Sequence, residues 1–298
     1  MGRGIRPHQT VSSVTMPRIS RRDGAAQEYV YPDHLRHCLD GLPAAPGVYI
    51  FHTDDTEGMP LYIGKSVNIR HRVMSHFRTI EEFHMLRQAR TVTFIRTAGE
   101  IGALLLEARM IKERQPLFNQ KLRRTRQLCS LRLRDGIAEV VYACDMNFAI
   151  ESDLHGLFSS RTSALEGLRK LADTHRLCYG KIGLEKIPAG RKCFRATIGQ
   201  CAGACCGAES LEDHASRFAA ALKKLRVACW PYPGAVGLIE RHDGNAQIHV
   251  VRNWCYLATV TNVEDAAEHG KVEAGFDADG YKILCRAILN NSVEIIPL

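Results

Sequence analysis

The sequence predicts an α+β protein: a small antiparallel sheet flanked by helices, followed by a cysteine-rich region and a small α+β C-terminal domain. Two short runs of β-branched and aromatic residues flank a turn-rich segment near the front, and helical periodicity follows them. Four cysteines between positions 178 and 205 separate this front part from a tail with mixed patterns. We therefore expect five parts: 1–28, a disordered basic tail; 41–121, the front domain; 122–177, a connecting segment; 178–209, the cysteine-rich region; and 210–298, the C-terminal domain.

The front domain opens with a predicted β-hairpin. Its strands are the runs P-G-V-Y-I-F and P-L-Y-I-G-K, which contain G-V-Y at 47–49 and Y-I-G at 62–64. Residues 52–59 between them supply Thr, Asp and Gly as turn chemistry. Because alternate side chains of a strand point to opposite faces, we expect Tyr49 and Tyr62 to bring two phenols to one face of the sheet.

A helix is predicted directly after the hairpin, with Ser66 as its N-cap. Ile69 and Val73 recur at helical spacing and mark its buried side. At about 100° per residue, Arg72 and His76 lie beside this apolar stripe and therefore toward the sheet. An arginine and a histidine next to a buried face require an explanation, although either residue alone is more often a solvated surface residue.

A second helix is predicted from 100 to 114, ended by Pro116, and Glu107 is unusual within it. Glu107 lies at the edge of the apolar face, and no basic residue occupies the positions three or four away. A desolvated carboxylate is costly unless a cation compensates its charge. A divalent metal ion is one candidate, and a structural ion pair with Arg72 or Lys65 is the other.

The charge distribution predicts a polyanionic partner for the front part of the chain. Residues 41–127 hold 14 Lys and Arg against 8 Asp and Glu, whereas residues 128–298 hold 20 against 20. A localised basic excess is typical of binding to a phosphate backbone, although a solvated basic segment is the plain alternative. Four basic residues are clustered at the end of the front domain: Lys121, Arg123, Arg124 and Arg126.

The chain contains 11 cysteines, and four of them form a group with Cys206 adjacent as a spare thiol. The group is Cys178, Cys193, Cys201 and Cys205. The opening residues are polar and show no signal peptide, so we expect a reducing compartment, the cytoplasm, where clustered cysteines bind metals. Zinc usually takes two close C-x2-4-C pairs, and an iron–sulfur cluster tolerates the wider spacing found here. A cluster, Zn²⁺ and no metal all remain open on spacing alone.

The remaining segments predict short strands and two helices. A strand is expected at 138–143, a helix from about 163, and a second helix from Ser210, which has Asp213 three residues later as a capping partner. Further strands are expected at the end of the chain, with a turn at Asp243-Gly244; they span 236–239, 248–251 and 254–259.

The order of these front motifs resembles the GIY-YIG nuclease family: G-V-Y, Y-I-G-K, an arginine, L-L-L-E-A and P-L-F-N. The resemblance implies that two tyrosines line the active face, that a lysine and an arginine surround the scissile phosphate, and that a glutamate binds one divalent metal, Mg²⁺ or Mn²⁺. His76 is a departure, since many relatives have tyrosine there. The residues carried over are Tyr49, Tyr62, Lys65, Arg72, His76, Glu107 as the metal ligand, and Asn119 as a support of the site.

The implied reaction is hydrolysis of a phosphodiester with one metal ion. We expect cations near Tyr62 to raise its acidity so that it orients or deprotonates the attacking water, while Arg72 and Lys65 hold phosphate oxygens. A two-metal site needs several converging carboxylates, and the acidic residues of the hairpin loop and at 81–82 lie elsewhere in the sequence. Glu107 alone has the context of a buried site.

Stretches outside the catalytic signature, among them C-A-G-A-C-C-G and G-F-D-A-D-G-Y-K-I-L-C, resemble the Cho subfamily, short bacterial homologues of the UvrC amino-terminal half. This resemblance covers about 29–290. It implies a 4Fe-4S cluster on the four cysteines, and one incision 3′ of a lesion in nucleotide excision repair, accessory to UvrC and within the SOS response. The implied partners are damaged double-stranded DNA and UvrB, loaded by UvrA.

Two other functions remain open from the sequence. One is a UvrB-independent, structure-specific nuclease of the same family, and the other is a non-catalytic DNA-binding redox sensor. The C-terminal domain could dock onto UvrB, a hypothesis that rests on its neutral charge and on Trp230, Tyr232 and Trp254.

Overall fold

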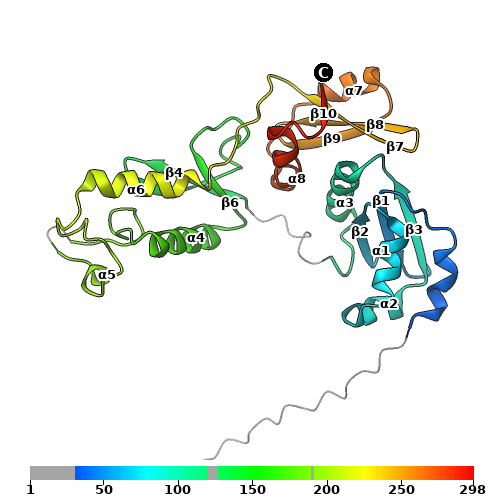
Figure 1. Cartoon of the computed structure of the whole chain (residues 1–298), viewed down its shortest axis with the longest axis horizontal. Helices are drawn as coiled ribbons and strands as arrows, with labels where there is room; N and C mark the ends of the chain where they lie inside the picture. Colours follow the sequence, from blue (N-terminus) through cyan, green and yellow to red (C-terminus); the bar gives the residue numbers. More distant parts are fainter. Residues whose placement is uncertain (1–30, 120–126, 189–190) are drawn as a thin grey trace, which may run out of the picture.

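The computed structural model of the protein describes residues 31–119, 127–188 and 191–298. The predicted basic tail at 1–28 and the cluster Lys121, Arg123, Arg124 and Arg126 lie outside the described residues. Within them, three antiparallel sheets each pack with their own helices, which confirms the α+β class (Figure 1).

The front domain is built on a three-stranded sheet with the order β2-β1-β3. The predicted hairpin is confirmed, because β1 and β2 pair antiparallel from Gly47 opposite Ser66 to Phe51 opposite Tyr62. A further strand, β3, pairs with the other side of β1, so β1 is central and buried along its whole length. The elements are η1 (Asp33–Leu39), β1 (Gly47–His52), β2 (Tyr62–Ser66), α1 (Ile69–His76), η2 (Ile80–Glu82), α2 (Phe83–Gln88), β3 (Thr91–Arg96) and α3 (Glu100–Arg114).

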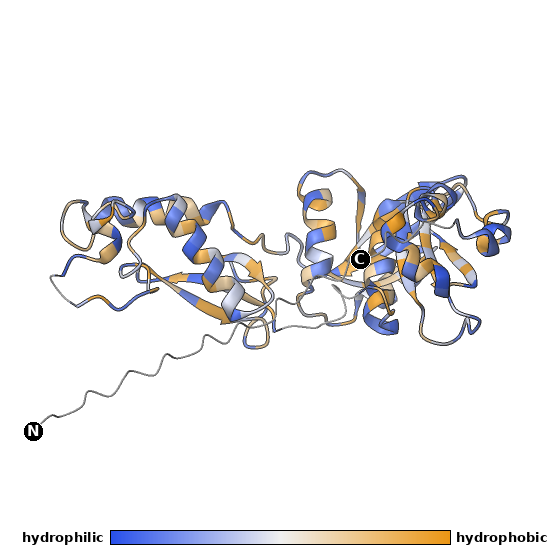
Figure 2. Cartoon of the chain, turned by 90° about the horizontal axis from the view of Figure 1, so that it is seen from below, coloured by the Kyte–Doolittle hydropathy of each residue, from blue (hydrophilic) through white to orange (hydrophobic). Residues whose placement is uncertain are grey.

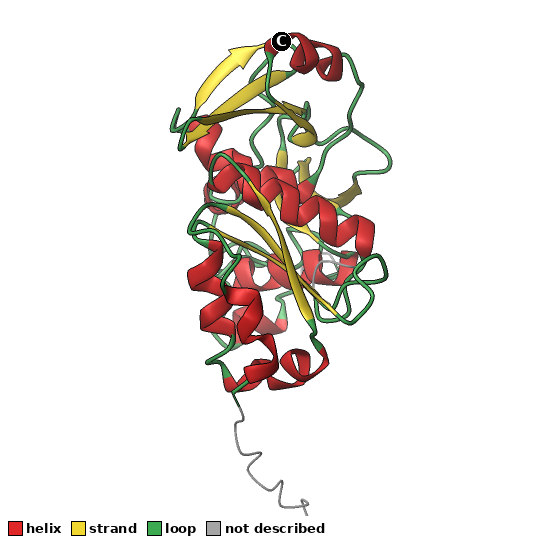
Figure 3. Ribbon diagram, turned by 90° about the vertical axis from the view of Figure 1, so that its right-hand side faces the viewer, coloured by secondary structure: helices red, strands yellow, loops and turns green. Residues whose placement is uncertain are grey.

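The two faces of this sheet bury different side chains, as the alternation along the strands predicts. Tyr49 and Tyr62 share one face and pack with the residues of α1, and their ring centroids lie 6.2 Å apart. Val48 and Ile63 lie on the opposite face and pack against α3. The sheet is therefore enclosed by α1 on one side and α3 on the other, and Figure 3 shows helices beside its strands.

Two glycines of the hairpin are required by close approach. A Cβ at Gly47, whose φ is +158°, would lie 2.1 Å from the backbone oxygen of Ile95 on β3. A Cβ at Gly64 would lie 2.3 Å from the hydroxyl oxygen of Tyr49. The first glycine permits the strand pairing, and the second makes room for a phenol over the edge strand.

The start of α1 differs from the expectation. Asn68 is the N-cap, and its side chain accepts from the backbone N–H of His71. Ser66 is the last residue of β2, and its hydroxyl oxygen accepts from the N–H of Asn68 at 3.0 Å. The prediction of Ser66 as the cap was wrong because β2 includes Ser66 and α1 begins only at Ile69, which makes Asn68 the capping residue.

Residues 129–222 form a second unit around one hydrophobic core. The sheet has the order β5-β4-β6, and α4 and α6 both contribute to its core, as Leu168 and Phe218 show. The expected helix start at Ser210 is confirmed, since its hydroxyl accepts from the N–H of Asp213. The expected domain boundary at 210 does not match the packing, because α6 contributes to the core of this middle unit. The elements are β4 (Cys129–Arg134), β5 (Ile137–Tyr142), β6 (Leu154–Phe158), α4 (Arg161–Thr174), α5 (Phe194–Thr197) and α6 (Leu211–Lys223).

The C-terminal unit is a four-stranded sheet with the order β10-β7-β8-β9. The turn at Asp243-Gly244 between β7 and β8 has positive φ at both residues, as predicted. Trp230 and Trp254 are 9 % and 0 % exposed and form the core of this unit, so they give no support to a docking surface. The elements are β7 (Val236–His242), β8 (Asn245–Arg252), β9 (Cys255–Val260), α7 (Val263–Gly270), α8 (Ala278–Leu289) and β10 (Glu294–Pro297).

The distribution of hydropathy fits helices and strands that are each buried on one side. Figure 2 shows hydrophobic and hydrophilic residues alternating along the helices and strands. None of the helices in the described ranges combines the length and the apolar character that a bilayer span requires.

Candidate active site and cysteine cluster

An open pocket of about 400 Å³ lies where β2, α1 and the N-terminal half of α3 meet. Five of the seven predicted site residues of the front domain line it. The lining residues are Tyr49, Tyr62, Lys65, Ser66, Val67, Arg72, Glu100 and Glu107. His76 and Asn119 are not among them, although both contact residues or strands of the pocket.

The outward edge of β2 explains how Glu107 and Asn119 are placed. Because β2 is an edge strand, every second residue turns its backbone groups away from β1. The N–H and C=O of Ile63 are both paired with the side-chain amide of Asn119, at 2.9 Å each. Two residues further, the N–H of Lys65 donates to Oε1 of Glu107 at 3.0 Å. The two side chains therefore take over the role of a missing neighbouring strand.

Glu107 combines a buried position with an unusual protonation equilibrium. Burial raises the pKa of its carboxyl above the ordinary value, and the N–H and charge of Lys65 and the charge of Arg72 only partly oppose this effect. The Lys65 ammonium group instead contacts Glu100 at 2.6 Å. Of the two ion pairs that the sequence left open, neither forms at hydrogen-bonding distance among the described contacts.

A chain of polar side chains lies behind the pocket, from Tyr49 through His76 to Glu82. The Tyr49 hydroxyl lies 2.6 Å from Nε2 of His76, and Nδ1 of His76 contacts the Glu82 carboxylate. A carboxylate only accepts, so Nδ1 of His76 donates to Glu82, and Nε2 shares the second hydrogen bond with the Tyr49 hydroxyl. Tyr49 and His76 are each 1 % exposed, so the chain orders the buried wall of the pocket.

Tyr62 is the half-buried phenol of the pocket, and its acidity differs from the expectation. Burial, followed by the charge of Glu107, raises the pKa of Tyr62, and the opposing charge of Arg72 is smaller. The protein's own groups therefore do not produce the expected increase in acidity, because desolvation and a nearby carboxylate outweigh one exposed guanidinium. The pKa of Tyr49 is raised as well, mainly by burial.

The residues present fit one divalent cation at Glu107. Its carboxylate oxygens are hard ligands of the kind that Mg²⁺ and Mn²⁺ prefer, and Mg²⁺ commonly binds through one or two carboxylates and retains waters. Only one backbone N–H donates to this carboxylate among the described residues, and the pocket beside it is open. Glu100 is the other carboxylate of the pocket, and it is paired with Lys65.

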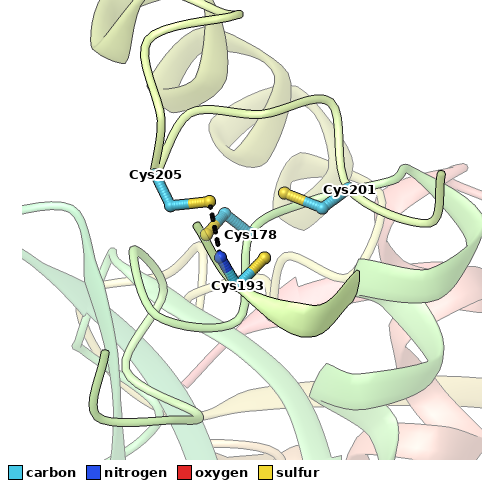
Figure 4. Close-up of side chains that lie close together, drawn as sticks. All are labelled: Cys178, Cys193, Cys201 and Cys205. Atoms are coloured by element: carbon cyan, nitrogen blue, oxygen red, sulfur yellow. Dashed lines mark hydrogen bonds between the residues drawn. The ribbon is translucent and has the colours of Figure 1, made fainter. Parts of the chain in front are cut away.

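The four cysteines that the sequence grouped lie together in the middle unit (Figure 4). Their sulfur atoms all lie within 4.8 Å of one another, and three of the four side chains are buried. The N–H groups of neighbouring residues point at them: that of Cys193 donates to Sγ of Cys205 at 3.4 Å, and that of Ala196 to Sγ of Cys193 at 3.2 Å. Cys206 stands outside the group and is exposed.

This donor set fits a bound metal. Burial and the neighbouring thiols Cys178 and Cys193 raise the pKa of Cys201 to about 12, so the four thiols cannot all ionise without a cation. A tetrahedral Zn²⁺ with bonds of about 2.3 Å would hold its sulfurs about 3.8 Å apart. A cubane is larger and would need the side chains to rotate outward. A single zinc ion fits the four positions as they stand and a cubane fits after these rotations, so the type of metal stays open.

Sequence reasoning missed three acidic residues that act as partners in the front domain. Glu82 contacts the buried His76, Glu100 pairs with Lys65, and Glu240 comes from the C-terminal unit to the start of α3. Glu100 lies in the first turn of a predicted helix, which is a usual place for a solvated acid. The partners of Glu82 and Glu240 are set by tertiary packing, which leaves no local signal.

Comparison with known proteins places similar sequences along almost the whole chain. Three family models match: "UvrC-like GIY-YIG domain" at 45–120, "UvrC/Cho excinuclease, middle domain" at 128–224 and "Excinuclease Cho C-terminal domain" at 235–298. The chain is 53% identical over 288 residues to "Excinuclease cho" of Escherichia coli (strain K12), with 97% of each chain covered. It is 54% identical over 274 residues to "Excinuclease cho" of Salmonella typhi, covering 92% of this chain and 93% of the relative.

A solved structure is similar over the front domain alone. It is the GIY-YIG N-terminal endonuclease domain of UvrC from Thermotoga maritima, bound to magnesium as its catalytic divalent cation. The identity is 33%, with 28% of this chain and 94% of that chain covered and a TM-score of 0.26.

Proposed function

The chain belongs to the Cho excinuclease family and is a DNA-repair endonuclease, and from that premise we propose that it makes one metal-dependent incision on the 3′ side of a lesion, accessory to UvrC. The observation that carries this proposal is the convergence of Tyr62, Arg72 and Glu107 on one open pocket. A phenol, a guanidinium and a carboxylate supply the three functions that phosphodiester hydrolysis requires at one site. With one such site described, one strand is cut in each event.

In this site, the basic residues bind and orient the scissile phosphate. Arg72 is exposed at the pocket, and its planar guanidinium suits two phosphate oxygens. Lys65 is held by an exposed pair with Glu100, and such pairs contribute little, so the ammonium can exchange its partner for a phosphate oxygen. Tyr62 orients the attacking water with its hydroxyl.

Glu107 is the proposed ligand of the divalent cation, Mg²⁺ or Mn²⁺, which when bound supplies a positive charge at the departing 3′ oxygen. The N–H of Lys65 holds Oε1 of Glu107 and so fixes the carboxylate relative to β2. Tyr49 and His76 fix the buried wall of the pocket, and Asn119 fixes the edge strand that carries Tyr62. These three are positioning residues in the proposed mechanism.

For the middle unit we propose a 4Fe-4S cluster on Cys178, Cys193, Cys201 and Cys205, with Zn²⁺ as the alternative. The support is the compact group of four sulfurs, three of them buried, in a chain related to UvrC. We also propose that Lys121, Arg123, Arg124 and Arg126 contact the DNA backbone, on the basis of their clustered charge.

The proposed partner is UvrB, loaded on damaged DNA by UvrA in the bacterial cytoplasm. The test is incision of an end-labelled duplex carrying one bulky adduct, in Mg²⁺, with and without UvrA and UvrB. A single nick 3′ of the adduct that requires UvrB supports the proposal. Equal cutting without UvrB, or cutting of branched undamaged DNA, would establish the independent structure-specific nuclease instead.

A further inference from the structure

The N-terminus of α3, the helix that carries Glu107, is capped by a side chain from the C-terminal unit. The residue before the helix is Gly99, which has no side chain to cap it. The N–H groups of Ile101 and Gly102 donate to the two carboxylate oxygens of Glu240, at 2.9 and 2.7 Å. Glu240 lies on β7, so a residue 139 positions away supplies the cap that the helix lacks.

A buried histidine, His249, holds the capping carboxylate of Glu240 in place. Nε2 of His249 lies 3.0 Å from Oε2 of Glu240, and its Nδ1 lies 2.8 Å from the hydroxyl of Thr259. The His249 side chain is fully buried, and that of Glu240 is 13 % exposed. Hydrogen bonds from His249 and from the two helix N–H groups lower the pKa of Glu240 although burial opposes them, so the carboxylate is charged where the positive end of the helix dipole lies.

The helix sequence makes room for this contact. A Cβ at Gly99 would lie 2.2 Å from an oxygen of Glu240, and a Cβ at Gly102 would lie 2.5 Å from Cε1 of His249. Gly102 stands inside the first turn of α3, where alanine would ordinarily favour the helix. The two glycines thus match the approach of Glu240 and His249.

The contact between α3 and the C-terminal unit continues along the face of the helix that points away from the front sheet. Leu105 is 2 % exposed and belongs to the core of the C-terminal unit with Trp230 and Trp254. Two turns later, Lys112 contacts Asp277 at 2.8 Å, where Asp277 caps α8. Figure 1 shows α3 lying between the front sheet and the C-terminal unit. One helix is therefore shared by two cores.

We propose that Glu240 is a positioning residue for the incision reaction: it fixes the start of α3, and with it Glu107, so that the C-terminal unit sets the affinity of the active site for its divalent cation. The inference rests on the proposed role of Glu107 as metal ligand. It assigns a task to the C-terminal unit that needs neither UvrB nor DNA. About one and a half helical turns separate the capped N–H groups from Glu107 on the same helix.

The test uses the full chain and two readouts that do not depend on incision. Glu240→Ala should speed amide hydrogen exchange in the peptide covering 99–106 by about tenfold, since a lost cap frees the first turn. It should weaken Mg²⁺ binding in calorimetry by roughly tenfold, and Glu240→Gln should lie between it and wild type. Glu294→Ala is the matched control, because it removes an exposed ion pair with Arg241 in the same unit and should change neither readout.

Gly102→Ala tests the contact from the helix side. The added methyl group would displace His249 and should therefore also speed exchange in the 99–106 peptide and weaken Mg²⁺ binding. Alanine ordinarily favours a helix over glycine, so helix propensity alone would have the opposite effect on exchange. Both tryptophans of the chain, Trp230 and Trp254, lie in the core that the C-terminal unit shares with Leu105 of α3. Unchanged tryptophan emission in the variants would show that α3 and the C-terminal unit remain together. If Glu240→Ala proves unfolded, Gly102→Ala and Glu240→Gln decide by the same readouts.

Two results would overturn the proposal. One is wild-type exchange of the 99–106 peptide in Glu240→Ala, which would show that the cap does not hold the helix. The other is faster exchange with unchanged Mg²⁺ affinity, which would confine Glu240 to a structural role. A failure of the metal assignment is distinguishable, because Glu107→Gln would then bind Mg²⁺ as wild type does.

Discussion

Oε1 of Glu107 accepts a hydrogen bond from the backbone nitrogen of Lys65 at 3.0 Å, which links the centre of α3 to the edge strand of the front sheet. The ammonium group of the same lysine contacts Glu100, the first residue of α3. Because the backbone N–H, and not the ammonium group, holds Glu107, the proposed mechanism lets the carboxylate keep its position while Lys65 exchanges Glu100 for a phosphate. In that mechanism, substrate binding and metal binding use the same pair of residues without competing.

Arg72→Ala should raise the activation free energy of incision at saturating substrate by on the order of 3 kcal/mol and so slow the reaction. Other preorganised groups that stabilise developing charge have effects of this size. Arg70→Ala is the control, since Arg70 lies on the same helix, is exposed and does not line the pocket. Single-turnover incision of the adducted duplex measures both. Equal losses in the two variants would assign Arg72 to general attraction of DNA.

Tyr49→Phe should destabilise the front domain by about 1–3 kcal/mol, because it removes the hydroxyl that is hydrogen-bonded to the buried Nε2 of His76. Urea unfolding followed by circular dichroism gives the free energy of unfolding. A change below about 0.5 kcal/mol would show that the contact between Tyr49 and His76 does not hold the pocket wall.

Cys201→Ser should release the metal of the middle unit and lower the thermal stability of residues 129–222, whose core packs around the cysteine-bearing segment. The adjacent control is Cys206→Ser, because Cys206 is exposed and lies outside the group of four sulfurs. Protein prepared without air should be brown for a cluster, and metal analysis should find iron and sulfide. Colourless protein with one zinc would select the alternative, and an equal effect of both variants would contradict the assignment of ligands.

The lowered pKa of Glu240 predicts acid-sensitive docking of the C-terminal unit. A carboxyl group whose pKa is lower in the folded state than in the unfolded state stabilises the fold above the unfolded value, near 4.5, and this contribution is lost as the pH falls through the lower folded value. The loss of stability between about pH 5 and pH 3 should therefore be smaller in Glu240→Gln than in wild type. Thermal unfolding at several pH values measures it, and parallel curves would contradict the account.

The local elements of the front domain could be predicted from sequence because each has its own periodicity. The helix expected at 100–114 is α3 with the same bounds, and the hairpin forms with the expected facing of Tyr49 and Tyr62. β3 was not predicted, although its sequence, T-V-T-F-I-R, is rich in the β-branched and aromatic residues that indicate a strand. The grouping of the four cysteines was also predictable, since metal-binding chemistry leaves its residue type in the sequence.

Long-range relationships could not be predicted in the same way. The contribution of α6 to the same core as α4 depends on how their apolar faces meet the rest of that core, and either face alone would fit another partner. The contact between Glu240 and Gly102 joins residues 138 positions apart, and a glutamate in a short strand shows no local sign of capping a distant helix. The raised pKa of Tyr62 follows from burial, which only the assembled pocket determines.

The most direct test of the central claim compares wild type with Glu107→Gln in the incision of the adducted duplex across a range of Mg²⁺ concentrations, with UvrA and UvrB present. The amide can still accept from the N–H of Lys65 but lacks the charge that binds the cation, so structure and DNA binding should persist. The account predicts a loss of incision of more than roughly 100-fold at every Mg²⁺ concentration, with unchanged DNA affinity. Incision by Glu107→Gln at the wild-type rate would contradict it.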